Sequence, residues 1–353
     1  MDVKKIQKIK DIIQSSNFNF LIGAGLSMPF LPPLNDIEAK MNNAETVEEK
    51  YKISKEYFEK VMLPNKKIVL QQFDYSEDEN GVSEIGKYET VIKQYQIFFD
   101  LIANILFERK GTILSKQANI FTTNIDIFME KALEDNNLNY NDGFSGNLEP
   151  SFDISNFKKT IHKKSLHFEN TSEIPTFNLI KVHGSLTWIL NEKSKRINFT
   201  KLNHIDESLL KESMTAFQKE YEKIMVVNPE ISKLSKTVLD VIYYELLRVY
   251  SAELEKENSV LFVLGFSMED EHIREITLRS ANSNPTLTVF IFCHSKDKAE
   301  GMRTKIGKPR YNNIEIIEPT DNSNENKFNF KNINEQLFNK VLHGKNSEVK
   351  EDE

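Results

Sequence analysis

The chain has 353 residues, 39% of them hydrophobic, a formal net charge of −7 and one cysteine, Cys293. This length and composition suit one large packed α/β core with insertions and exclude wholesale disorder. The negative charge gives no general reason to bind nucleic acid or an anionic membrane, and one cysteine excludes an intrachain disulfide and a cysteine-based zinc ribbon.

The first elements along the chain are an N-terminal helix and a set of short strands. Residues 1–14 alternate Lys and Asp with isolated Ile and Val, which predicts an amphipathic helix and not a signal peptide. No apolar run approaches the roughly 20 residues of a membrane-spanning helix, so we expect a cytoplasmic protein. Short apolar runs predict buried strands of a mostly parallel sheet. They are residues 18–22, 118–121, 179–182, 260–264 and 287–293.

The recurring order of strand, polar turn and helix predicts the fold class. It favours α/β architecture with a doubly wound, Rossmann-like parallel sheet, which binds ligands at the carboxyl ends of its strands. Two insertions interrupt the order. Residues 36–109 carry apolar residues at helical spacing and predict a helical insertion over the sheet, with an acidic surface loop at 72–86. Residues 142–177 are rich in Ser, Asn and Lys and predict either an ordered hairpin or a flap.

The rest of the chain predicts one more core helix and an extension. Residues 238–254 have apolar positions at helical spacing and are expected to pack on the sheet. We expect residues 1–300 to form one domain that includes both insertions. Residues 301–353 would then be a C-terminal extension, with a charged and disordered tail at 344–353.

The first chemically informative segment is residues 21–27, Leu-Ile-Gly-Ala-Gly-Leu-Ser, directly after a predicted strand. Gly23 and Gly25 let the chain turn sharply and approach a pyrophosphate, which the following amides and helix N-terminus can hold. A tight turn without a ligand explains the same residues equally well. The third glycine and the acidic residue of a dehydrogenase fingerprint are not evident, which weakens that interpretation.

The second segment is residues 121–126, Phe-Thr-Thr-Asn-Ile-Asp, again directly after a strand. Asn124 and Asp126 can each reach one ligand, because an amide both donates and accepts hydrogen bonds and a carboxylate accepts them. The alternative is an ordinary Asx turn, or an N-cap by Asp126 for a helix over residues 127–133.

The third segment is Lys181-Val182-His183-Gly184-Ser185. A histidine at a strand end can project its imidazole into a crevice and transfer protons near neutral pH, which makes His183 the best candidate base. A lone histidine is more often structural, so that alternative stays open without the other segments.

The fourth segment is residues 264–273, Leu-Gly-Phe-Ser-Met-Glu-Asp-Glu-His-Ile. Gly265 permits close approach of a ligand and Ser267 can hydrogen-bond a phosphate or ribose. Asp270 is expected to be the N-cap of the next helix and His272 to be structural. The acidic residues make this turn a poor site for a bare phosphate unless backbone amides dominate.

Taken in order, each at a strand end, these segments closely resemble the sirtuin family. The match comprises GAGLS at 23–27, TTNID at 122–126, HGS at 183–185 and GFSMEDEHI at 265–273, with little recognisable similarity between them. The GFSMEDEHI form and the large helical insertion most resemble sirtuin-like bacterial antiphage effectors that deplete NAD.

The resemblance implies an NAD glycohydrolase that releases nicotinamide and ADP-ribose. It implies that Asn124 binds the nicotinamide ribose and positions the attacking water, and that His183 is the general base. It also implies a set of residues that hold the pyrophosphate, the nicotinamide carboxamide and the adenosine side of NAD. These are Gly23, Ala24, Gly25, Ser27, Thr123, Asp126, Gly265 and Ser267.

The sequence departs from the deacylating sirtuins in two respects. They carry four zinc-binding cysteines and follow the first motif with Pro-Asp-Phe-Arg, whereas this chain has one cysteine and continues Met-Pro-Phe-Leu-Pro-Pro at 28–33. We therefore expect no zinc. Deacylase or ADP-ribosyl transferase activity, a non-catalytic sensor of an NAD-derived nucleotide, and a nuclease component of an ATPase complex are the alternatives. The resemblance further implies a homo-oligomer and a HerA-type ATPase as a partner.

Overall fold

A computed structural model of the protein describes residues 3–32, 40–41, 43–79, 81–109, 113–166, 169–191, 193–226, 238–320 and 327–344. Its centre is a seven-stranded sheet in the order β14-β13-β12-β1-β2-β8-β3, and every neighbouring pair is parallel. The predicted doubly wound α/β fold is thereby confirmed. The strands are β1 (Asn17–Ile22), β2 (Gln117–Thr122), β3 (Asn139–Asn141), β8 (Thr176–Lys181), β12 (Ser259–Leu264), β13 (Thr288–Phe292) and β14 (Ile314–Ile317).

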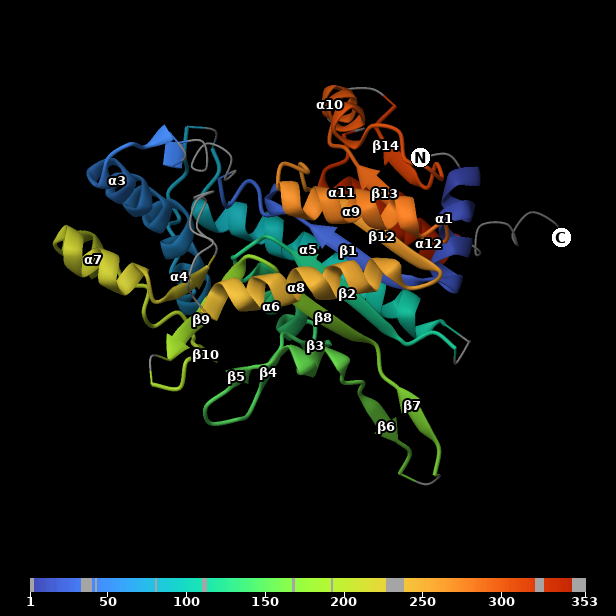
Figure 1. The fold of residues 1–353 in the computed structure, drawn as a ribbon, viewed down its shortest axis with the longest axis horizontal. Coiled ribbons are helices and arrows are strands. Elements are labelled where there is room, and N and C mark those ends of the chain that lie inside the picture. The colour runs from blue at the N-terminus through green and yellow to red at the C-terminus, as the bar shows by residue number, and fades with distance from the viewer. Residues whose placement is uncertain are drawn as a thin grey trace.

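Helices cover both faces of the sheet (Figure 1). On one face α5 (Glu84–Phe107) packs on β1, where the rings of Phe20 and Phe98 lie 5.2 Å apart. On the other face α8 (Val238–Glu255) packs on β2, where Phe121 and Tyr250 lie 4.8 Å apart. The remaining helices around the sheet are α1 (Val3–Ser15), α6 (Phe128–Asp135), α9 (Glu271–Ser283) and α10 (Lys296–Ile306). Helix α1 confirms the amphipathic helix predicted at residues 1–14, and α8 confirms the core helix predicted at residues 238–254.

The helical insertion contains α3 (Val47–Tyr57), a π-helical turn (Phe58–Met62), α4 (Leu63–Leu70) and then α5. Thr46 and Glu49 form a capping box that begins α3, and Ser83 caps α5 by accepting from the amide of Gly86. The predicted surface loop ends at Ser83, three residues earlier than expected, because that cap starts α5 at Glu84. The predicted start of the insertion at residue 36 lies outside the described residues.

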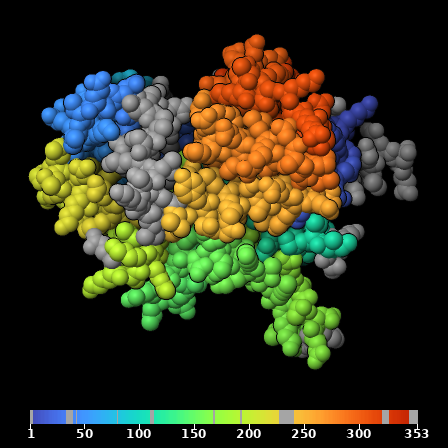
Figure 2. Space-filling model, viewed as in Figure 1, coloured from blue at the N-terminus to red at the C-terminus, as the bar shows by residue number. Residues whose placement is uncertain are grey.

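Within the second insertion, 142–177, the described residues form short strands, one 3-10 helix and the start of β8, and its assignment as a hairpin or a flap stays a prediction. Strands β4 (Phe144–Ser145) and β5 (Ser151–Phe152) join β9 (Gly184–Asn191), β10 (Arg196–Phe199) and β11 (Ile224–Val226) in an antiparallel sheet. Strands β6 (His162–Lys164) and β7 (Thr171–Glu173) form a separate antiparallel hairpin. Figure 2 shows this hairpin projecting from the body of the molecule. The other short helices that the structure describes are the 3-10 helices Ala24–Leu26, Ile154–Lys158 and Glu207–Lys211, and α7 (Met214–Tyr221).

The C-terminal part of the chain returns to the α5 face of the sheet. It contains α11 (Phe330–Ile333), a π-helical turn (Asn334–Phe338) and α12 (Asn339–His343). Phe338 packs against Phe20 and Phe98. The division at residue 300 stays a prediction, and residues 345–353 of the predicted tail lie outside the described part of the chain. Among the helices that the structure describes, none has the length and apolarity needed to cross a membrane.

Four asparagines lie in register across adjacent strands of the parallel sheet. Asn19 of β1 faces Asn119 of β2, Asn119 faces Asn178 of β8, and Asn178 faces Asn141 of β3. Amide-to-amide hydrogen bonds of 2.9 and 2.8 Å join Asn119 to Asn19 and Asn178 to Asn119. Asn119 also donates to Glu253 of α8 at 3.0 Å, so this ladder is a row of hydrogen-bonded amides across the middle of the sheet.

Candidate functional site

The ends of four neighbouring strands, β12, β1, β2 and β8, bring the four predicted segments to one edge of the sheet. The turn after β1 includes a 3-10 helix, Ala24–Leu26, and it packs directly on the turn after β12. The amide of Gly23 donates to the carbonyl of Leu264 and that of Gly25 to the carbonyl of Gly265, both at 3.0 Å. The first and fourth segments therefore form one continuous surface.

The glycines of these two turns are required by this close packing. A Cβ atom on Gly23 would lie 2.5 Å from the carbonyl oxygen of Gly265, and one on Gly25 would lie 2.9 Å from it. Gly265 has φ +62°, and a Cβ there would lie 2.8 Å from the Leu26 side chain. Gly25 is exposed and Ala24 partly exposed, so a ligand can reach the backbone of this turn. Contact with a pyrophosphate stays a prediction.

Ser27 lies at the centre of a buried polar cluster. Its hydroxyl donates a hydrogen bond to Oδ2 of Asp126 at 2.8 Å and accepts one from Nδ2 of Asn124 at 3.3 Å. It also lies 3.2 Å from the Tyr95 hydroxyl. Ser27 has no exposed surface. The predicted residues Asn124 and Asp126 thus both contact the predicted residue Ser27, as does Tyr95 of the insertion.

Asp126 orders the turn after β2 while remaining buried. Its Oδ1 accepts from the amide of Phe128 at 3.2 Å, as the Asx-turn alternative suggested, but the N-cap position of α6 is Ile127. Burial raises the pKa of Asp126, against the opposing effects of Lys181 and of the hydrogen bond from Ser27. Its predicted contact with a nicotinamide carboxamide would require a group that reaches this interior position.

The side chain of Asn124 presents a buried hydrogen-bond acceptor. Both nitrogen atoms of Asn124 donate hydrogen bonds: the backbone N–H donates to the Thr122 hydroxyl at 3.0 Å, and the side-chain Nδ2 donates to Ser27. Its side-chain carbonyl oxygen Oδ1 is buried and has no hydrogen-bond partner within the described chain. A buried acceptor without a partner is costly, so this oxygen fits a donor supplied by a ligand. Thr123, also a predicted binding residue, is partly exposed next to it.

Lys181 and Glu130 form a buried ion pair that the sequence did not reveal. Nζ of Lys181 lies 2.7 Å from Oε1 of Glu130, also donates to Ser185 at 3.2 Å and contacts the backbone carbonyl of Asp126. Their side chains are 3% and 13% exposed, so both charges are held inside the protein. Burial raises the pKa of Glu130, and the nearby Lys181 opposes that rise. This pair ties the end of β8 to α6.

His183 and Asp270 form a second pair at the surface of the same edge. Nε2 of His183 lies 2.8 Å from Oδ2 of Asp270, and the two side chains are 19% and 15% exposed. Because an ionised carboxylate only accepts, Nε2 carries the proton and Nδ1 of the neutral ring is left as a proton acceptor. Burial raises the pKa of Asp270, but the hydrogen bond from His183 outweighs it and holds the pKa below its ordinary value.

Asp270 also confirms the predicted N-cap of α9, since its Oδ1 accepts from the amide of Ile273 at 3.1 Å. The carboxylate therefore orients His183 from a helix terminus that fixes its own position. Ser267 lies on the same turn, where it is exposed, and its backbone carbonyl accepts from Lys305 at 3.1 Å. Lys305 also pairs with Glu269, so part of the acidic charge of this turn is compensated.

Metal ligation receives no support from the described residues. Within the parts of the chain that the structure describes, no group of three or more His, Cys, Asp or Glu side chains is placed to hold a metal ion. Cys293 is buried, and burial raises the pKa of its thiol to about 11, which disfavours the thiolate that metals bind. Absence of zinc stays a prediction.

Comparison with known proteins identifies one family. A family model described as a SIR2-like domain matches residues 118–317, more than half of the 353-residue chain. The matched span begins within β2 and includes β8 and β12 with Asn124, His183 and Asp270, whereas the turn after β1 precedes it. No curated protein matches the chain.

Proposed function

The chain belongs to the SIR2-like family of NAD-dependent enzymes, and from this premise we propose that it hydrolyses NAD to nicotinamide and ADP-ribose. The observation that carries the proposal is the pairing of two chemical functions at neighbouring strand ends. Asn124 offers a buried carbonyl oxygen that has no partner among the described residues, and His183, oriented by Asp270, offers a ring nitrogen that can accept a proton. Strands β2 and β8 hold these residues two positions beyond the paired Thr122 and Lys181.

In the proposed reaction the bond between the nicotinamide nitrogen and ribose C1′ breaks, and its electron pair leaves with nicotinamide. Water attacks C1′, which has oxocarbenium character, and the proton that water loses passes to Nδ1 of His183 and then to solvent. Oδ1 of Asn124 accepts a hydrogen bond from a ribose hydroxyl or from the attacking water. Asp270 stabilises the protonated imidazole by its charge.

Hydrolysis is favoured over peptide deacylation by the cysteine count. A cysteine-based zinc module requires several cysteine thiolates. This chain has a single cysteine, Cys293, which is buried just after β13. The non-catalytic sensor is disfavoured because a sensor has no need for a proton acceptor held by a carboxylate. A nuclease is disfavoured because no acidic cluster suited to a metal occurs among the described residues.

Product identification is the direct test. Purified protein incubated with NAD is expected to release nicotinamide and ADP-ribose in equal amounts, measured by liquid chromatography with mass spectrometry. NAD consumption that requires an acylated peptide and yields an acylated ADP-ribose would instead establish a deacylase. Tight NAD binding without turnover, with every candidate partner present, would establish the sensor.

We further propose that the protein is an antiphage effector that acts as a homo-oligomer, in a complex with a HerA-type ATPase. Unregulated NAD hydrolysis would kill the host cell, so assembly offers a means of control. The helical insertion provides a surface for it, with Val47 of α3 63% exposed. Light scattering is expected to give a mass above that of one chain, and cellular NAD should fall on phage infection only when the protein is present. A monomeric mass at all concentrations, with and without the ATPase, contradicts the assembly.

A further inference from the structure

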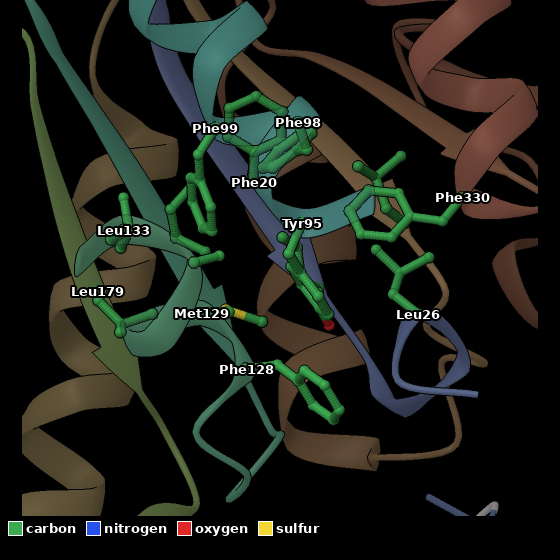
Figure 3. Close-up of a cluster of buried hydrophobic side chains, with 14 of the residues drawn as sticks. Phe20, Leu26, Tyr95, Phe98, Phe99, Phe128, Met129, Leu133, Leu179 and Phe330 are labelled. Carbon is green, nitrogen blue, oxygen red and sulfur yellow. The ribbon is translucent and has the colours of Figure 1, made fainter. Parts of the chain in front are cut away.

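Tyr95 connects the helical insertion to the candidate site. It lies in the middle of α5, is completely buried, and stacks on Phe128 of α6 with ring centroids 5.8 Å apart. Phe330 of α11 meets the same ring edge-on at 4.9 Å. Figure 3 shows Tyr95 within this apolar cluster, with its hydroxyl end directed away from Phe98 and Phe99. A buried tyrosine requires a partner for its hydroxyl, and here that partner is Ser27.

With the Asp126 carboxylate ionised, counting hydrogens around Ser27 gives the direction of each bond. A serine hydroxyl has one hydrogen and two lone pairs, and the hydrogen is donated to the Asp126 carboxylate. The two other neighbours, Tyr95 and Asn124, must therefore both donate to the Ser27 oxygen. Burial raises the pKa of Tyr95 well above 10, which keeps its hydroxyl protonated as a donor.

The orientation of the Asn124 amide follows from the same count. Only its NH₂ group can approach an oxygen whose own hydrogen is used elsewhere, so Oδ1 must face away from Ser27. Without the Tyr95 hydroxyl, one lone pair of Ser27 would lose its donor and the buried cluster would no longer be fully paired. The Ser27 hydroxyl, and with it the Asn124 amide that donates to it, would then be less firmly held in place.

We propose that Tyr95 is a positioning residue for the NAD hydrolysis proposed above: by donating to Ser27, it holds the Asn124 amide with Oδ1 open to the substrate. The proposal rests on the proposed function for its kinetic consequence only. It also connects the C-terminal segment to the site, because Nδ2 of Asn334 donates to the backbone of Gln94, next to Tyr95, at 3.0 Å. The insertion is thus part of the machinery that orders Asn124.

The kinetic test compares two tyrosines of the same helix. Tyr95→Phe removes only the hydroxyl, and Tyr88→Phe is the matched control because the Tyr88 ring also stacks on Phe128, at 5.9 Å. We expect Tyr95→Phe to lower kcat for nicotinamide release about 3- to 10-fold, with KM changed less than about twofold. Tyr88→Phe should match the parent. In an Asn124→Ala background, Tyr95→Phe should cause no further loss. An equal loss in both tyrosine variants, or an additive loss in the double variant, would overturn the proposal.

A second measurement does not depend on activity. The side-chain amide resonances of Asn124 are identified in nitrogen-15 spectra as those missing from Asn124→Ala. They are expected to shift or broaden in Tyr95→Phe and in Ser27→Ala, and to stay unchanged in Tyr88→Phe. Unchanged resonances in Tyr95→Phe refute the positioning role even if the parent is an active hydrolase. A parent that never consumes NAD refutes the proposed function instead, while the resonance shift still decides the role of Tyr95.

Discussion

Replacing His183 by alanine is expected to lower the rate of nicotinamide release by about 100- to 10,000-fold, the usual contribution of a general base. Asn124→Ala is expected to cause a loss of the same order, because it removes the group proposed to align ribose and water. NAD affinity, measured by calorimetry, should fall far less than turnover. The reason is that both residues are proposed to act on the reacting carbon, while the turns after β1 and β12 are proposed to hold the rest of NAD.

Two controls make this result specific. His162→Ala removes an exposed imidazole from the β6–β7 hairpin, outside both larger sheets, and should leave turnover unchanged. Asp270→Asn preserves an N-cap for α9 but removes the charge that holds the His183 tautomer, so it should reduce turnover without unfolding the helix. If His183→Ala or Asn124→Ala, folded and correctly assembled, hydrolyses NAD at nearly the parent rate, the proposed site is wrong.

The largest expected effect on stability comes from Lys181→Met. The methionine fills a similar volume but leaves the Glu130 carboxylate buried without its partner, which typically costs about 3–5 kcal/mol. Denaturant unfolding should show a lower midpoint with an unchanged slope. Lys131→Met is the matched control, because Lys131 pairs with Asp135 at a more exposed position and such pairs contribute about 0–1 kcal/mol.

The pH dependence of that loss has a defined sign. Burial raises the pKa of Glu130 above its ordinary 4.5, so the folded state takes up a proton more readily than the unfolded chain. Protonation of Glu130 removes the unpaired charge that Lys181→Met leaves buried. The difference in free energy of unfolding between this variant and the parent should therefore shrink as the pH falls toward the raised pKa of Glu130. A difference that stays constant from neutral to acidic pH would mean that lost packing, and not an unpaired charge, causes the destabilisation.

Patterns within a short stretch of sequence predicted the strands of the sheet well. The predicted runs at 18–22 and 260–264 became β1 and β12, and the helix predicted at 238–254 became α8. Asp270 was recognised as an N-cap because the cap and its amide are three residues apart. Periodicity and capping are local properties, so one sequence is enough to read them.

Partners that are distant in sequence could not be predicted in this way. His183 and Asp270 are 87 positions apart, and Ser27 and Tyr95 are 68 apart. Lys181 interrupts the apolar run 179–182, and a lysine would ordinarily be expected at the surface. Only the position of α6 shows that its ammonium group is buried against Glu130. The sequence therefore predicted which segments carry the chemistry. The residues that orient them could be identified only from the tertiary structure.

The asparagine ladder has a consequence for how accurately the strand ends are aligned. Sliding one strand by two residues keeps its apolar side chains on the same faces, so hydrophobic burial alone discriminates poorly against such a slip. Because Asn119 is hydrogen-bonded to both Asn19 and Asn178, the same slip would leave buried amide groups without hydrogen-bond partners, opposite apolar side chains. The ladder thus fixes the register of β1, β2 and β8. By doing so it sets the relative positions, along the strand direction, of Ser27, Asn124 and His183, which follow the ends of these strands.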